Sequence, residues 1–283
     1  MSGFVVLIVL FGALLHASWN VIVKSGTDKY LSAVMVSGAA GLIAVVFLPF
    51  VPLPASASWP YMFTSTVFQV IYMFLVAAAY SNGDMSLAYP LMRGTPPLLV
   101  ALVSGPLIGE VLGAEQWLAV GLISAGVLVM ALGRSQAIIA GRNTTRTIII
   151  ALVNALFIAG YTLVDGVGVR VSGNAVSYVL WAFLFNAIPV VSWGIWTYRG
   201  QLLTHIKQRG HLTIIGGAGT LGSYGLALWA MTMAPVAMVA ALRETSILFG
   251  VMLSLILLRE QISAKRLLGA VLIVGGTMMM RLS

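Results

Sequence analysis

The chain carries one stretch of sequence twice, first as RGTPPLLVALVSGPLIGEVLGAEQWLAVGLISAGVLVM (residues 93–130) and again as RETSILFGVMLSLILLREQISAKRLLGAVLIVGGTMMM (residues 243–280). The copies align without a gap at an offset of 150 residues, and 12 of the 38 aligned positions are identical. Arg93 aligns with Arg243, Glu110 with Glu260 and Gly126 with Gly276. Chance similarity between apolar segments explains matching leucines but not matching charges at a single offset. The pattern therefore indicates an internal duplication.

Around this repeat the chain is an almost continuous series of apolar segments. It is 60% hydrophobic and 8% charged, whereas soluble domains carry about 25% charged residues. A helix needs about 20 apolar residues to cross a bilayer. Helices satisfy their own backbone in lipid, and strand-like alternation is absent, so the sequence predicts an all-α polytopic membrane protein. Ten segments fit: 1–23, two within 30–83, 86–108, 116–133, 147–164, one within 174–198, two within 211–258, and 267–280.

Five segments in each half are an odd number, so the second half must enter the membrane the other way up. We therefore predict ten transmembrane helices in two inverted five-helix repeats, residues 1–133 and 147–283, joined by a cytoplasmic linker at 134–146. Eleven Lys and Arg residues fall in the connections after segments 1, 5, 7 and 9, while the opposite side, with both termini, holds Arg170 and Arg281. This asymmetry places the basic side in the cytoplasm of a bacterial inner (plasma) membrane protein.

The opening segment and the repeat together resemble a known family. The stretch ALLHASWNVIVK at 13–24, and the Gly109-Glu110 and Arg259-Glu260 pairs that each precede an apolar helix, are similar to EamA-type proteins of the drug/metabolite transporter (DMT) superfamily. The resemblance covers essentially the full length. It implies ten helices, two EamA units and transport driven by an ion or substrate gradient without ATP. It does not name a substrate, because amino acids, sugars, amines, nucleotide-linked compounds and drugs all occur in this family.

Charged side chains inside the apolar segments are the first candidates for a site, because each costs at least about 2.5 kcal/mol on insertion scales. Arg93 and Arg243 could hold a carboxylate or phosphate, and Glu244 could hold an amine or take up a coupling proton. All three could instead simply tie helices together. Glu244 could pair with Arg93 or with neither Arg, since adjacent helical positions point about 100° apart.

Aromatic and amide side chains form a second group of candidates. In the sixth segment Asn154, Tyr161 and Asp165 share one helix face. His16 is a second coupling candidate, although the pattern favours a hydrogen-bonded intramembrane histidine. The predicted substrate-binding set is Trp19, Asn20, Tyr80, Tyr89, Arg93, Tyr161, Trp229, Arg243 and Glu244.

Buried charges of both signs beside aromatic residues favour a secondary transporter that exports or exchanges a small polar or zwitterionic metabolite, such as an amino acid or amine. The alternatives are a carrier of phosphonate-like or other organic anions, a flippase for a lipid-linked sugar, and a non-transporting scaffold. A small closed midplane cavity lined by Glu244 and aromatic side chains favours the metabolite carrier, and a cavity open to lipid favours the flippase. We expect no enzymatic activity, no cofactor and no metal site.

The expected partners are the small-molecule substrate and membrane lipid. The net charge of +8 is spread singly between apolar runs, which argues against nucleic acid. Two complete halves in one chain predict a functional monomer.

Overall fold

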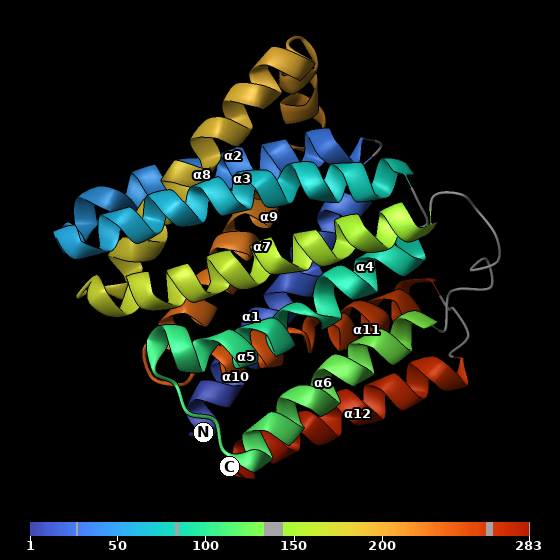
Figure 1. Cartoon of the computed structure of the whole chain (residues 1–283). Coiled ribbons are helices and arrows are strands. Elements are labelled where there is room, and N and C mark those ends of the chain that lie inside the picture. The colour runs from blue at the N-terminus through green and yellow to red at the C-terminus, as the bar shows by residue number, and fades with distance from the viewer. Residues whose placement is uncertain (27, 83–84, 133–143, 259–262, 283) are drawn as a thin grey trace.

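The structure is a computed structural model of the chain, and it describes residues 1–26, 28–82, 85–132, 144–258 and 263–282. This part of the chain is helical almost throughout (Figure 1). Its α-helices are α1 (Gly3–Lys24), α2 (Lys29–Phe47), α3 (Trp59–Asn82), α4 (Met85–Gly94), α5 (Pro96–Ile108), α6 (Ala114–Leu132), α7 (Thr144–Val171), α8 (Ala175–Tyr198), α9 (Gln201–Met231), α10 (Val236–Arg243), α11 (Ser246–Leu258) and α12 (Ala264–Leu282). Two 3-10 turns, Leu48–Phe50 and Ser56–Ser58, connect α2 to α3.

Eight segments of the described chain are long and apolar enough to cross a membrane. Two of these segments consist of consecutive helices, because α4 with α5 and α10 with α11 each count as one. Helix α6 contributes a shorter apolar segment, Ala114–Met130. Helix α12, which begins with Lys265 and Arg266, packs along α6. The chain is therefore a multi-pass membrane protein.

The helices pair across the two halves of the sequence. Helix α3 packs on α7, α1 on α9, α2 on α8 and α6 on α12. Figure 1 shows α3 and α7 side by side, with α6 and α12 together at the opposite edge of the molecule. The N- and C-termini lie close together at one end, so the chain finishes on the side where it began.

Close glycine contacts hold α6 against α12. A Cβ on Gly126 would lie 2.7 Å from the carbonyl oxygen of Gly269 and 2.7 Å from Cγ1 of Ile273. A Cβ on Gly276 would lie 2.8 Å from the carbonyl oxygen of Ala119 and 2.7 Å from Cγ1 of Ile123. Each glycine lets one backbone approach the other, which is how small residues promote helix packing in lipid.

Two helices break inside apolar segments. The α4–α5 break falls at Thr95, followed by Pro96 and Pro97, whose nitrogens cannot donate hydrogen bonds. The α10–α11 break has no proline. There the amides of Glu244 and Thr245 donate to carbonyls three residues back, and the Thr245 hydroxyl donates to the Leu242 carbonyl at 2.7 Å. The helix tightens locally and its axis is interrupted.

Helix α7 is longer than the sixth segment that the sequence predicted. It starts at Thr144, within the predicted linker, and continues past residue 164 to Val171. The helix continues past Asp165, because hydroxyl groups of neighbouring helices donate hydrogen bonds to this buried carboxylate. The other linker residues, 134–143, lie outside the described residues.

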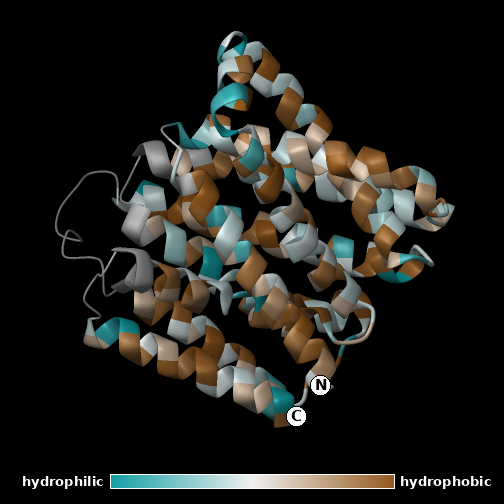
Figure 2. Ribbon diagram, turned by 180° about the vertical axis from the view of Figure 1, so that it is seen from behind, coloured by the Kyte–Doolittle hydropathy of each residue, from teal (hydrophilic) through white to brown (hydrophobic). Residues whose placement is uncertain are grey.

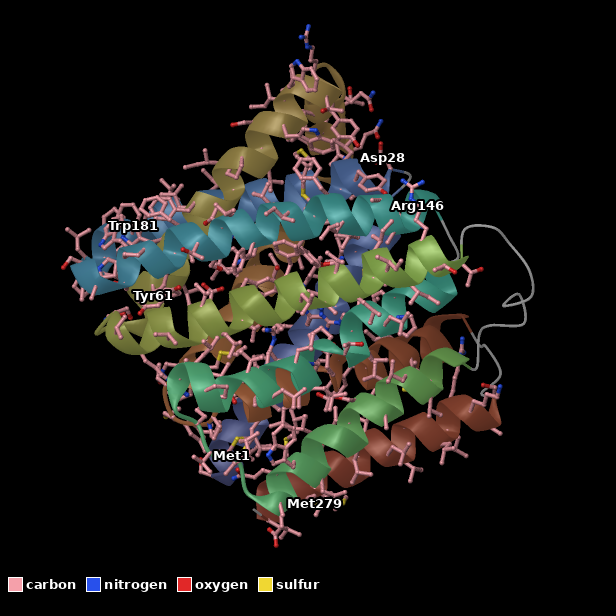
Figure 3. All side chains as sticks on the ribbon, viewed as in Figure 1. Met1, Asp28, Tyr61, Arg146, Trp181 and Met279 are labelled. Carbon is pink, nitrogen blue, oxygen red and sulfur yellow. The ribbon has the colours of Figure 1, made fainter. Side chains whose placement is uncertain are left out.

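Large apolar side chains are exposed over much of the surface. Figure 2 shows hydrophobic ribbon over much of the bundle and hydrophilic residues gathered at the α8–α9 turn. Large exposed side chains such as Leu42, Phe74 and Val271 point outward, as expected of a surface that faces lipid. In Figure 3, Tyr61 and Trp181 lie at one end of the molecule, while Asp28 and Arg146 lie at the other.

Candidate functional site

A small buried cavity lies where the two helix breaks meet α7. Its lining includes Arg93 and Pro96 at the first break, Arg243 and Glu244 at the second, and Tyr161 from α7. Its volume of about 10 Å³ is about what one water molecule needs. The three charged residues that the sequence singled out therefore share one cavity, and one of the predicted aromatic residues joins them.

The Glu244 carboxylate, at the α10–α11 break, pairs with the Arg93 guanidinium, at the α4–α5 break. The Arg93 Nε atom lies 3.1 Å from Glu244 Oε2, and Arg93 also donates to the Ser246 hydroxyl at 3.4 Å. The two charged atoms form an ion pair without a well-directed hydrogen bond. Glu244 thus pairs with Arg93 and not with Arg243, its neighbour in sequence.

Arg243 is the second cation of the cavity. Its guanidinium carbon lies 4.8 Å from the centre of the Tyr224 ring, a cation–π arrangement. Within the described residues, the two ion pairs are Arg93–Glu244 and Arg170–Glu110. Two cations and one carboxylate leave the cavity with a net positive charge, and that charge belongs to Arg243.

A second acidic group, Asp165 on α7, lies behind the aromatic wall of the cavity. Its side chain is fully buried and accepts hydrogen bonds from hydroxyls on three other helices. Ser65 of α3 donates at 2.7 Å, Tyr178 of α8 at 2.8 Å and Tyr224 of α9 at 2.5 Å. The rings of Tyr161 and Tyr224 meet edge to face with centroids 6.3 Å apart. Sequence reasoning placed Asp165 on a polar helix face but left it out of the site.

Comparisons with known proteins identify the second half of the chain. Residues 145–282, about half of it, match the model of the EamA-like transporter family. This second half belongs to the EamA-like transporter family. Members are membrane transporters of the DMT superfamily.

A solved crystal structure superposes with a TM-score of 0.76, covering 100% of this chain and 98% of that chain. The sequence identity is 18%, so the likeness concerns the fold. No curated protein matches the sequence.

In this EamA-like protein the predicted candidates on α1 make contacts within their own helix. The amide nitrogen of Asn20 donates to the carbonyl oxygen of His16 at 2.8 Å. The His16 and Trp19 rings meet edge to face with centroids 5.2 Å apart. The buried Trp19 indole nitrogen has no hydrogen-bond partner among the described residues. The structure does not bring these three residues into the lining of the charged cavity.

The remaining predicted aromatic residues of the EamA-like chain have separate places. Tyr89 is partly buried on α4, one turn before Arg93. Trp229 stands near the end of α9 with its ring 6.0 Å from that of Phe4, and it does not line the cavity. The Tyr80 side chain lies outside the described residues. Tyr161 is therefore the predicted aromatic residue that lines the cavity.

In the EamA-like protein an ion pair joins the end of α7 to the connection between α5 and α6, at the end where the termini lie. Arg170 at the end of α7 donates to Glu110 Oε1 at 2.6 Å and to the carbonyl oxygens of Met231 and Ala234. Glu110 also accepts from the amide of Val236 at 2.9 Å, which places a negative charge at the N-terminus of α10. The matching Glu260 lies outside the described residues.

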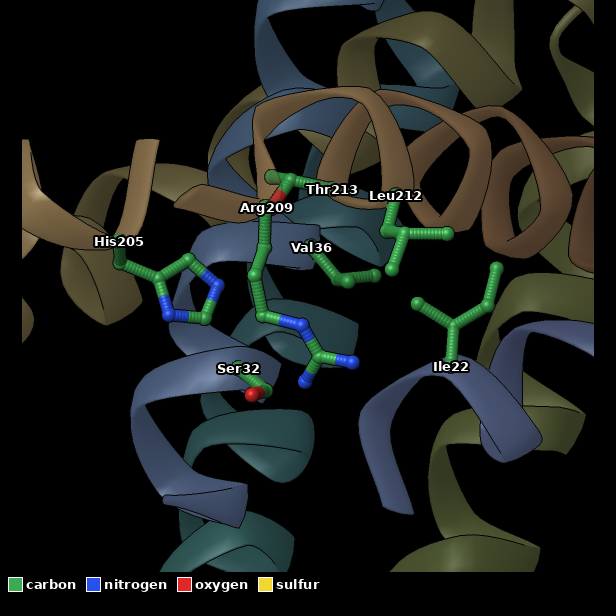
Figure 4. Close-up of a pocket in the computed structure, with 7 residues that line it drawn as sticks. All are labelled: Ile22, Ser32, Val36, His205, Arg209, Leu212 and Thr213. Carbon is green, nitrogen blue, oxygen red and sulfur yellow. The ribbon is translucent and has the colours of Figure 1, made fainter. Parts of the chain in front are cut away.

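Another small cavity of the EamA-like protein lies at the opposite end, among α1, α2 and α9 (Figure 4). Arg209 extends across it and donates to the Ser25 hydroxyl at 2.8 Å. His205 and Ser32 also line it, and its lining contains no carboxylate among the described residues. Arg209, the arginine in this lining, already donates a hydrogen bond to Ser25. The cavity around Arg243 is therefore the better candidate site.

Proposed function

We propose that this protein is a secondary transporter of a small metabolite that carries a carboxylate, with zwitterions such as amino acids as the first candidates. The observation that carries the proposal is Arg243, a cation that lines a cavity between the halves of the chain and has no ion-pair partner among the described residues. A guanidinium recognises a carboxylate in bidentate geometry. Aromatic side chains beside it suit the apolar part of such a substrate.

The pairing of Glu244 with Arg93 favours a zwitterion or anion over a simple amine. A cationic amine would have to displace Arg93 from Glu244, whereas a carboxylate can approach Arg243 directly. A zwitterion could then exchange its ammonium for Arg93 at Glu244. The second candidate function, transport of an organic anion such as a phosphonate, is supported by the two guanidiniums of this cavity.

The helix contacts support ten spans arranged as two inverted repeats. In this assignment α1 to α3 correspond to α7 to α9, the broken pair α4–α5 to α10–α11, and α6 to α12. Exchanging the halves then turns the α3–α7 contact into the α9–α1 contact, and both are present. The α2–α8 and α6–α12 contacts map onto themselves. Figure 1 shows α4–α5 and α10–α11 running in opposite directions.

Transport in this proposal is by alternating access around the cavity. The cavity has room for about one water molecule, so a metabolite can enter only when the halves separate on one side. Breaks at the equivalent residues Thr95 and Thr245 would serve as hinges, as discontinuous helices do in other transporters. A cavity this small fits a metabolite carrier better than a flippase. We place the protein in the bacterial inner membrane as a monomer, with its Lys- and Arg-rich end in the cytoplasm.

Counterflow in proteoliposomes tests the proposal with L-alanine, L-glutamate, choline and methylphosphonate as labelled probes. We expect uptake of an amino acid, its loss in Arg243→Ala, and partial recovery in Arg243→Lys, which keeps the charge but loses bidentate geometry. Arg199→Ala, on the α8–α9 turn, is the matched control and should transport normally. Uptake confined to choline, or full activity of Arg243→Ala, would refute the proposal. Uptake confined to methylphosphonate would select the second candidate.

A further inference from the structure

Asp165 is the buried acidic group that the proposed transport function does not yet use. Its carboxylate is fully buried in the middle of the bundle, although burying a charge in a membrane protein is costly unless it is paired or functional. No Lys, Arg or His in the described part of the chain lies within ion-pair distance of it. It is held by uncharged hydrogen-bond donors instead.

The hydrogen bonds to Asp165 leave room on its carboxylate for a proton. Oδ1 accepts from the Tyr178 hydroxyl, and Oδ2 accepts from Ser65, Tyr224 and, at 3.5 Å, the Gln69 amide. A carboxylate has about four lone-pair sites, and Oδ1 accepts one hydrogen bond, so a site on Oδ1 stays open to a proton. A hydroxyl can also turn and accept a hydrogen bond, so the cluster can satisfy Asp165 both with and without a proton.

The same cluster reaches the cavity through Tyr224. The Tyr224 hydroxyl binds Asp165, and its ring lies under the guanidinium of Arg243. Groups from several helices surround Asp165. Helix α3 supplies Ser65 and Gln69, with Tyr72 nearby, α7 itself supplies Tyr161, α8 supplies Tyr178, α9 supplies Tyr224, and α10 ends in Arg243, the charged group among them.

We propose that Asp165 is the proton-binding residue of the transport cycle and that Tyr224 links it to Arg243. The inference rests on the proposed function and names its coupling ion. The proton comes from water on one side of the membrane, binds to a carboxylate oxygen of Asp165, and returns to water on the other side. No other bond is made or broken.

The arrangement of charges determines the sign of the coupling. With Asp165 ionised, Arg93, Arg243, Glu244 and Asp165 sum to zero. With Asp165 protonated, one positive charge remains, and it faces the cavity on Arg243. The Tyr224 hydroxyl also loses a charge-assisted hydrogen bond, which is about twice as strong as a neutral one. A proton on Asp165 and a carboxylate on Arg243 therefore favour each other, and such coupling is typically about 5- to 150-fold in affinity.

The first test needs no substrate. Infrared difference spectra of the purified, reconstituted protein between acid and alkaline pH should show the C=O stretch of a protonated carboxyl group. One component of this band should be missing in Asp165→Asn and present in Glu244→Gln. Absence of the band in the wild type, or its loss only in Glu244→Gln, would overturn the proton site. Gel filtration establishes that each variant is folded.

The second test measures coupling, with L-alanine and L-glutamate as probes in proteoliposomes. An imposed pH gradient should drive their accumulation in the wild type. Asp165→Asn should lose this accumulation but keep exchange at equal pH. Tyr224→Phe should behave in the same way.

Tyr178→Phe separates the two contacts of Tyr224, because it removes a hydroxyl from the same carboxylate but is not part of the cation–π contact with Arg243. It should shift the pH at which accumulation falls but keep accumulation driven by the gradient. A gradient response that survives in Asp165→Asn, or that follows sodium instead of protons, would overturn the inference. A wild type that titrates at Asp165 but transports neither amino acid would overturn the proposed substrate class and leave the proton site standing.

Discussion

Replacing Gly126 by alanine tests the contact that holds α6 to α12. The added Cβ would lie 2.7 Å from the Gly269 carbonyl oxygen and 3.0 Å from the Ile273 amide nitrogen. Both obstacles are backbone atoms of α12, so the strain cannot be relieved by turning a side chain. The two helices would have to separate by several tenths of an ångström along a buried interface. Overpacking of this kind typically costs about 1–3 kcal/mol.

The size of the effect has to be separated from helix propensity. Alanine is favoured over glycine inside a helix by about 1 kcal/mol, which partly offsets the clash. Gly121→Ala removes this ambiguity, because Gly121 lies in the same helix and its Cβ would meet nothing within 4 Å. The propensity gain cancels between the two variants, so their difference in unfolding free energy should be about 1–3 kcal/mol.

The internal duplication adds a second, independent pair of variants. Gly276→Ala should destabilise the protein about as much as Gly126→Ala, since its Cβ would meet the Ala119 carbonyl oxygen at 2.8 Å. Gly275→Ala, with open space around it, is the control on α12. Unfolding in mixed micelles, followed by tryptophan fluorescence, measures all four. Equal stabilities of Gly126→Ala and Gly121→Ala would refute the packing argument.

The remaining predictions concern charged residues and one aromatic residue. Glu244→Gln should lower the unfolding free energy by about 3 kcal/mol, because it leaves Arg93 buried without its counter-charge. The double variant Arg93→Met, Glu244→Met should regain stability but not uptake. A double variant as unstable as Glu244→Gln alone would contradict this reasoning. Glu110→Gln should cost about 1 kcal/mol through the weakened cap on α10, whereas Glu115→Gln, exposed nearby, should change nothing measurable in the same assay. Trp229→Phe should leave amino-acid counterflow unchanged, and a loss of uptake would place that ring on the transport path.

The sequence was most informative about features that depend on the residues of one helix alone. Its composition predicted a lipid-facing helical protein. The rarity of charges inside apolar segments pointed to Arg93, Arg243 and Glu244, which the structure brings into one cavity. These inferences depend on the hydrophobicity and spacing of residues within one helix, and both are visible in the sequence.

Other parts of the site depend on how the helices meet. The break at Glu244–Thr245 has no proline, and it arises from local hydrogen bonds that nothing in the composition announces. Asp165 was visible as part of a polar helix face, but its donors come from α3, α8 and α9. His16, Trp19 and Asn20 form an equally promising pattern, yet they are not brought into the cavity lining.

By itself the sequence determined that the protein folds in lipid, that it is helical, and which segment is duplicated. A chain of this composition has few alternatives, because its apolar side chains need lipid around them and its backbone must form its own hydrogen bonds there. Only the tertiary structure decided which charge pairs with which. Helical periodicity places residues on a face, but the packing of helices far apart in sequence selects the partner for that face. That is why Glu244 pairs with Arg93 and not with the arginine beside it.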